Sequence, residues 1–186
     1  SGEIILEGKK LEIKDYCDAL ECGMVYVSED RKEKGLVIPM DIKENITMPI
    51  LQKLSKNKVV DSKEEMAISN HYMEQLSIKA PSIHSIVGNL SGGNQQKVAI
   101  AKALACKPKI LILDEPTRGV DVGAKSEIHR LISELAKEGL SIIMVSSDLP
   151  EVLGMADRVC VMKEGTIVEM FSREEATQEK VLAVSL

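Results

Sequence analysis

The chain has 186 residues, of which 24 are Lys or Arg and 29 are Asp or Glu, so its formal net charge is -5. This length fits one domain of ordinary size, and 44% hydrophobic residues are enough to build a core. Because only 2% of the residues are aromatic, we expect an aliphatic core and no stacking of bases on exposed rings. The acidic balance argues against nucleic acid as a partner, and no apolar run approaches the roughly 18 residues of a membrane span. We therefore expect a soluble, cytosolic protein.

The cysteines and histidines carry no metal-site signal. No CxxC pair and no Cys/His cluster with zinc spacing occurs, so we expect reduced thiols. The cysteines are Cys17, Cys22, Cys106 and Cys160.

The first 35 residues read as a β part. Residues 3–6 and 11–13 predict a hairpin about the turn at 8–10, and a short helix is expected near 15–21. Residues 24–28 predict a strand that ends in the charged loop 29–32. Open α/β sheets place ligand sites at such strand ends.

From residue 36 to 88 the pattern predicts helix. Ser62-x-x-Glu65 has the form of a capping box, and Pro81 ends the segment. A second helix is expected over 92–107, with Ser91 as its N-cap and Pro108 after its end.

The remaining chain alternates strand and helix. The apolar run 109–113 and the run 142–145 each predict a buried strand. A helix with Gly139 as its C-cap lies between them, and its spacing predicts one apolar face of Ala124, Ile128, Leu131, Ile132 and Leu135. Residues 158–162 and 166–171 predict a hairpin, and Ser172-x-x-Glu175 is expected to open a final helix. The alternation predicts an α/β fold with a mostly parallel sheet.

Two adjacent carboxylates, Asp114 and Glu115, follow the first of these strands. Such a pair suits a magnesium-phosphate site, because one carboxylate can bind Mg²⁺ through water while the other polarises an attacking water. Taken alone, the pair is equally compatible with the start of a solvated loop.

A second candidate site lies at the start of the helix that begins after Ser91. Ser91-Gly92-Gly93-Asn94-Gln95 places a hydroxyl and two small residues where free backbone N–H groups and the helix dipole favour an anion. Glycine at these positions allows close approach of the backbone to phosphate oxygens.

The stretch from Leu90 to Leu104 resembles the signature motif of ATP-binding cassette ATPases, and the resemblance extends over all 186 residues. It implies ATP and Mg²⁺ as cofactors, with Asp114 as the Walker B magnesium residue and Glu115 as the catalytic base. The segment from Gly119 to Asp121 resembles the D-loop. The signature residues would act in trans, on ATP bound to the opposite cassette; they are Ser91, Gly92, Gly93, Asn94 and Gln95.

Several stretches are more specifically similar to the second cassette of double-cassette importers of ribose, galactose or xylose. They are 27–32 with Gly35-Leu36, 43–45, 90–97, 117–125 and 150–154. This resemblance implies a sister cassette in the same polypeptide, a membrane permease, an indirect sugar-binding protein and a place on the inner face of the membrane. Nucleic acid is not implied as a partner.

Three features depart from a working cassette. No GxxxxGK[ST] phosphate loop occurs, so we expect this chain to be a fragment of a longer subunit and inactive alone. Glu29 stands where the family carries its Q-loop glutamine, and an ionised glutamate only accepts hydrogen bonds. Ser147 stands where a histidine normally follows the last buried strand. The site with Asp114 and Glu115 is therefore expected to bind nucleotide but turn it over poorly or not at all.

The expected fold is a partial P-loop-type cassette of the α/β class, with a parallel sheet, a helical subdomain and a small antiparallel hairpin. We divide the single cassette fragment into a β part with the Q-loop region (1–35), a helical subdomain (36–88) and a signature, Walker B, D-loop and C-terminal part (89–186). The expected function is energy coupling in sugar import; a silent regulatory cassette and a soluble non-transport ATPase remain alternatives. Such a fragment should expose apolar sheet surface.

Overall fold

The computed structural model describes residues 2–185. The chain forms two compact units that divide between Ile143 and Met144, and each unit is described by itself. Within residues 2–185, no helix has both the length and the apolar character needed to cross a bilayer. The four cysteines are free thiols, as expected.

The first unit begins with a small hairpin and a capped helix. Strands β1 (Ile4–Leu6) and β2 (Lys9–Leu11) pair antiparallel, which confirms the predicted hairpin. Helix α1 (Tyr16–Glu21) follows because the Asp15 carboxylate accepts a hydrogen bond from the Asp18 N–H at 3.0 Å.

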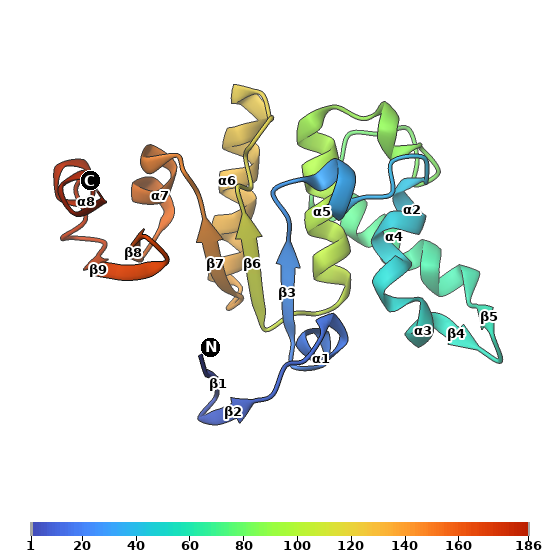
Figure 1. The fold of residues 1–186 in the computed structure, drawn as a ribbon. Helices are drawn as coiled ribbons and strands as arrows, with labels where there is room; N and C mark the ends of the chain where they lie inside the picture. The colour runs from blue at the N-terminus through green and yellow to red at the C-terminus, as the bar shows by residue number, and fades with distance from the viewer. Residues whose placement is uncertain (1, 186) are drawn as a thin grey trace. The chain divides into compact units, whose positions relative to one another are not determined.

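A parallel sheet forms the centre of this unit (Figure 1). Its strands are β3 (Met24–Val27), β6 (Ile110–Asp114) and β7 (Ser141–Val145), in the spatial order β3-β6-β7, and the division between the units falls within β7. Strands β3 and β6 run parallel, with Tyr26 opposite Ile112. The carboxyl ends of these two strands therefore meet at one edge of the sheet.

Alternate side chains of the sheet differ sharply in exposure. Val25, Val27, Leu111 and Leu113 are buried, whereas Tyr26 is 48% exposed. In β7, Ile143 and Val145 are 52% and 51% exposed, so the prediction of a buried strand there is wrong. Successive strand residues face opposite ways, and only one of the two sets is covered. The exposed apolar sheet surface expected from the sequence is present.

Two long helices supply much of the core. Helix α5 (Gly92–Ala105) buries Val98 and Ile100 completely, and helix α6 (Val122–Lys137) buries Ile128, Leu131, Ile132 and Leu135 at the predicted positions. Gly139 follows α6 with φ +97°, a left-handed conformation suited to glycine. The buried hydrophobic side chains of the described residues are Val, Leu, Ile and Ala, which confirms an aliphatic core.

The segment between η1 (Arg31–Gly35), one turn of π-helix, and α5 is mainly helical, as predicted. It also contains a hairpin, formed by β4 and β5, that the sequence pattern did not predict. The elements of the whole segment are α2 (Ile42–Thr47), the 3-10 turn η2 (Met48–Ile50), α3 (Leu51–Leu54), β4 (Ser55–Lys56), β5 (Val59–Val60), α4 (Ser62–Gln75) and the 3-10 turn η3 (Val87–Asn89).

The predicted capping box at Ser62 and Glu65 is wrong. Asp61 caps α4, because its Oδ1 accepts hydrogen bonds from the Lys63 and Glu64 N–H groups at 3.1 and 3.2 Å. Glu65 is instead 7% exposed and accepts from Lys43 Nζ at 2.8 Å and Thr47 Oγ1 at 3.0 Å. These two bonds connect α2 to α4.

The second unit contains α7 (Leu149–Met155), the antiparallel strands β8 (Arg158–Lys163) and β9 (Thr166–Ser172), and α8 (Gln178–Ser185). Val159, Val161 and Val181 form its small core. The hairpin confirms the prediction. Ser172 Oγ donates to Glu175 Oε2 at 2.7 Å, but the helix begins only at Gln178, so the predicted helix start is wrong.

Candidate functional site

Asp114 ends β6 with a tyrosine beside it. The Tyr26 hydroxyl donates a hydrogen bond to Asp114 Oδ2 at 2.5 Å. This bond raises the pKa of Tyr26, and partial burial adds to the rise. Sequence reasoning missed Tyr26, although alternation along β6 puts Asp114 on the same face as Ile112, which pairs with Tyr26.

Glu115 occupies an unusual backbone conformation. Its φ is +46°, in the left-handed region that non-glycine residues seldom adopt. The Arg118 N–H donates to the Glu115 carbonyl at 3.0 Å, so the chain turns sharply immediately after β6. Strained backbone of this kind is concentrated at functional sites.

Glu29, from the loop after β3, forms an ion pair with Arg118. Both side chains are partly exposed, at 39% and 64%. The guanidinium therefore compensates the negative charge of Glu29.

Arg31, two residues further on, is buried and contacts the same turn. It is 8% exposed, and its Nη1 and Nη2 donate to the carbonyls of Arg118 and Gly119 at 2.7 and 3.0 Å. Burial lowers the pKa of this guanidinium, although the nearby Asp30 opposes the shift. The sequence offered no signal that separates Arg31 from the other charges of its loop.

Ser91 caps α5 at the predicted anion site. Its Oγ accepts from the Asn94 N–H at 3.4 Å and from Asn94 Nδ2 at 3.0 Å. Asn94 Oδ1 accepts in turn from the Lys79 N–H at 2.8 Å. Asn94 thus fixes the orientation of the serine hydroxyl and connects it to the segment after α4.

The two signature glycines have a packing role that the sequence did not reveal. A Cβ on Gly92 would lie 2.8 Å from the Gly119 carbonyl oxygen, and one on Gly93 would lie 2.4 Å from Ala124 Cβ. Both contacts are too close for a real side chain. Glycine is therefore needed here for the approach of the 119–124 segment to α5.

Gln95 is buried in the first turn of α5. It is 5% exposed, and its Nε2 donates to the Val87 carbonyl at 3.1 Å. This bond attaches the turn η3 to the first turn of α5.

Asp121 caps α6, with its Oδ1 accepting from the Ala124 N–H at 2.9 Å. The first unit thus brings the Glu29 loop, the start of α5, the Asp114-Glu115 pair and the 118–121 turn together. Ser147 belongs to the second unit. There its neighbour Ser146 donates to Glu151 Oε2 at 2.6 Å and accepts from the Asp148 N–H at 3.0 Å.

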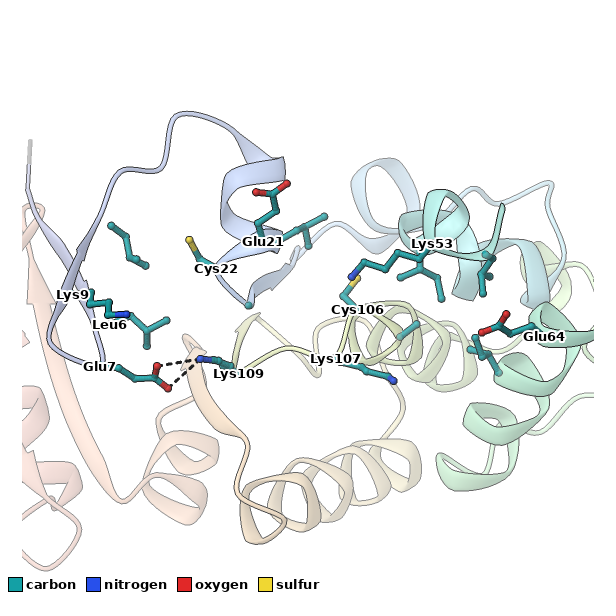
Figure 2. Close-up of a pocket in the computed structure, with 17 residues that line it drawn as sticks. Leu6, Glu7, Lys9, Glu21, Cys22, Lys53, Glu64, Cys106, Lys107 and Lys109 are labelled. Carbon is teal, nitrogen blue, oxygen red and sulfur yellow. Dashed lines mark hydrogen bonds and ion pairs between the residues drawn. The ribbon is translucent and has the colours of Figure 1, made fainter. Parts of the chain in front are cut away.

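An open pocket of about 830 Å³ lies away from these residues (Figure 2). It includes Gly23 and Lys109, which directly precede β3 and β6, so it lies at the opposite strand ends from Asp114. Its lining mixes apolar side chains with charges of both signs, and Lys109 pairs with Glu7 at 3.1 Å.

The donor set at the sheet edge fits a magnesium ion that keeps several waters. Among residues 2–185, no group of three or more His, Cys, Asp or Glu side chains could hold a metal ion by itself. Asp114 offers one partly buried carboxylate at the strand end. Mg²⁺ is commonly held by one or two carboxylates together with water and substrate phosphates.

Comparisons with a protein family and with individual proteins agree with each other. The family described as ABC transporter matches residues 1–118. The chain is 53% identical over 182 residues to the xylose import ATP-binding protein XylG of Moorella thermoacetica. It is 52% identical over 181 residues to the ribose import ATP-binding protein RbsA of Oceanobacillus iheyensis. These matches cover 98% and 97% of the chain but only 36% of each relative.

Solved structures show the same fold. The ATP-binding cassette MJ1267 has a TM-score of 0.81 at 24% identity, covering 100% of this chain and 77% of that chain. A dimer of the cassette MJ0796 bound to ADP and Pi has a TM-score of 0.76 at 22% identity, covering 93% of this chain and 74% of that chain. These similarities establish the cassette fold.

Proposed function

Because the chain belongs to the ABC transporter family, we propose that it is part of the ATP-hydrolysing, energy-coupling subunit of a monosaccharide importer. The relatives named for xylose and ribose import support this substrate class. The observation that carries the proposal is the convergence of Glu29, the start of α5 and the Asp114-Glu115 pair around the 118–121 turn.

Each residue of this cluster has a role in the proposed reaction. Bound Mg²⁺ would neutralise charge on the phosphates, and Asp114 would hold it through water. Glu115 would act as the base that orients and polarises the attacking water. Tyr26 donates to the Asp114 carboxylate and so restricts its rotation.

The start of α5 would act on the nucleotide of a sister cassette. Its free N–H groups and the Ser91 hydroxyl would bind the γ-phosphate, with Gly92 and Gly93 contributing backbone donors. Asn94 would orient Ser91, and Asp121 would communicate between the two cassettes. Gln95 supports the first turn of α5 by donating to the Val87 carbonyl.

The proposed partners follow from the proposed role in an importer. The subunit would act at the cytoplasmic face of the membrane, with residues 36–88 docking against a permease. A sugar-binding protein would take part indirectly, and the sugar would be recognised there and in the permease. We propose the three-part division of the cassette at residues 35 and 88 on this basis.

The two ATP sites of such a subunit would differ in activity. Glu29 and Ser147 replace a glutamine and a histidine, so the site with Asp114 and Glu115 would bind nucleotide and turn it over slowly. The 186-residue chain lacks a phosphate-loop motif and would be inactive alone. Its signature would complete the active site of the sister cassette.

Two substitutions in the longer subunit test this division of labour. Ser91→Arg should abolish ATP hydrolysis, because the bulky cation blocks the signature, whereas Glu115→Gln should cost little. Ser133→Arg, on an exposed position of α6, is the control for a serine-to-arginine change. A large loss in Glu115→Gln with activity retained in Ser91→Arg contradicts the proposal. Full activity in both variants contradicts an ATPase role for this cassette.

A further inference from the structure

Arg31 carries a charge into a site that offers it no carboxylate contact among its described hydrogen bonds. Burial of a guanidinium is costly unless its donors are satisfied. Two of its nitrogens donate to main-chain carbonyls, and within residues 2–185 its buried Nε has no hydrogen-bond partner. Among the described residues, the hydrogen bonds of this buried guanidinium are therefore these two carbonyl contacts.

Those carbonyls belong to a turn that lacks regular secondary structure. Gly119 has φ +65°, and the turn's own bonds run from the Arg118 N–H to Glu115 and from the Val120 N–H to Thr117. Although Arg118 and Gly119 are exposed residues, their two successive carbonyls accept hydrogen bonds from the buried Arg31 guanidinium.

A second contact joins the same two segments in the opposite direction. Arg31 donates from the 29–31 segment to the 118–119 turn, while the Arg118 side chain returns to pair with Glu29. We refer to these contacts between Glu29, Arg31, Arg118 and Gly119 as the clasp. It connects the loop after β3 to the turn that leads to Asp121.

The clasp also lies directly against the first turn of α5. A Cβ on Gly92 would come within 2.9 Å of Arg31 Nη2, as well as within 2.8 Å of the Gly119 oxygen. At the far end of η1, Lys102 Nζ of α5 donates to the Gly35 carbonyl at 2.9 Å. The π-helical turn is thus hydrogen-bonded to α5 at Gly35, and Arg31 at its other end lies close to Gly92.

We infer that Arg31 is a positioning residue that fixes the 118–121 turn against the start of α5. Arg31 thereby holds Asp121 in a fixed position relative to Ser91. The inference rests on the proposed function for its consequence in catalysis. Arg31 itself touches no reacting group.

Hydrogen exchange in the longer subunit tests the positioning role. Arg31→Met should speed exchange of the Val120 amide by about tenfold or more, because two charge-assisted hydrogen bonds are lost. Arg31→Lys retains the charge with one donor group and should give a smaller increase. Lys102→Met removes a similar cation-to-carbonyl bond from η1 and should leave Val120 unchanged.

Two exchange results would overturn the inference. One is an unchanged Val120 amide in Arg31→Met. The other is an equal increase throughout α5 and β6, which would make Arg31 a general support of the fold. This readout needs no ATP turnover, so it stays interpretable if the proposed function is wrong.

ATP turnover tests the consequence for catalysis. Arg31→Met should lower kcat by about tenfold while KM for ATP stays within about twofold, since Arg31 places groups without binding nucleotide. An unchanged kcat in Arg31→Met, in a protein whose Val120 amide exchanges faster, would overturn the role of the clasp in catalysis.

Discussion

The buried ammonium group of Lys97 donates a hydrogen bond to Glu127 Oε2 at 2.7 Å. Lys97 is in α5 and Glu127 in α6, and the Lys97 side chain is 4% exposed. Lys97 also donates to the Ser77 carbonyl at 3.0 Å, and Lys79 donates to Glu127 Oε1 at 3.1 Å. The hydrogen bond from Lys97, followed by that from Lys79, lowers the pKa of Glu127 to about 2. Glu127 thus connects both helices to the segment after α4.

The Glu127 contacts predict a pH-dependent loss of stability in Glu127→Gln. A depressed carboxyl pKa stabilises the folded state above the unfolded pKa of about 4.3, and this contribution disappears as pH falls to about 2. At pH 7 the free energy of unfolding should fall by about 1 kcal/mol, allowing for screening of a 36% exposed carboxylate. Urea unfolding from pH 7 to 2.5 should show the difference shrinking only below about pH 4.5. Glu134→Gln, from an exposed pair with Arg130, should show almost no loss at pH 7.

Gly93→Ala should destabilise the contact between α5 and α6. The new methyl group would meet Ala124 Cβ, so the free energy of unfolding should fall by about 1–3 kcal/mol. Ala124→Gly in the same chain should recover part of that loss, because it removes the colliding methyl group. Gly154→Ala is the control, since no atom lies within 4 Å of its added Cβ. Denaturant unfolding of Gly93→Ala, of Ala124→Gly alone, of the double variant and of Gly154→Ala measures the coupling, and strict additivity of the two single changes would contradict the close contact.

Lys43→Met should be costly because it leaves the Glu65 carboxylate buried without its cation. The two side chains are 17% and 10% exposed, and we expect a loss of about 3 kcal/mol in the free energy of unfolding. Lys43→Met combined with Glu65→Leu should lose less than Lys43→Met alone, since no unpaired charge remains. Lys56→Met, from the exposed pair with Asp61, should be nearly neutral. Chemical denaturation checks the ranking, and equal losses in Lys43→Met and Lys56→Met would contradict it.

Mg-ATP binding should depend on a phosphate loop that this chain does not contain. We expect no measurable binding by the 186 residues alone and clear binding by a version extended at its N-terminus to include such a loop. Isothermal titration calorimetry of both proteins measures the difference, with Asp114→Asn in the extended version as the magnesium-site control. Binding by the short chain with unchanged affinity would show that other groups hold the phosphates.

The sequence predicted the elements whose signal is local. The periodicity of Ile128, Leu131, Ile132 and Leu135 predicted the buried face of α6, and Ser91 and Gly139 correctly indicated where helices begin and end. These features depend on spacing within one or two turns, so they can be read along the chain. The resemblance of residues 90–104 likewise indicated the family before the fold was known.

Predictions from local patterns were wrong where the same pattern fits two different environments of a residue. Glu65 has the spacing of a capping box after Ser62, yet Asp61 caps α4 and Glu65 is buried against Lys43. Ile143 is apolar like its neighbours, yet it is half exposed. In both cases the outcome depends on which other element packs nearby, and the local pattern does not contain that information.

By itself the sequence determined the α/β class, most helices and strands, and the family. Only the tertiary structure decided how the residues of the candidate site are positioned. The contacts of Tyr26 with Asp114 and of Arg31 with the Gly119 carbonyl each join residues 88 positions apart. Such contacts arise when parallel pairing of β3 and β6 brings two distant strand ends to one edge of the sheet. No periodicity along the chain encodes them, because their geometry exists only once the sheet has formed.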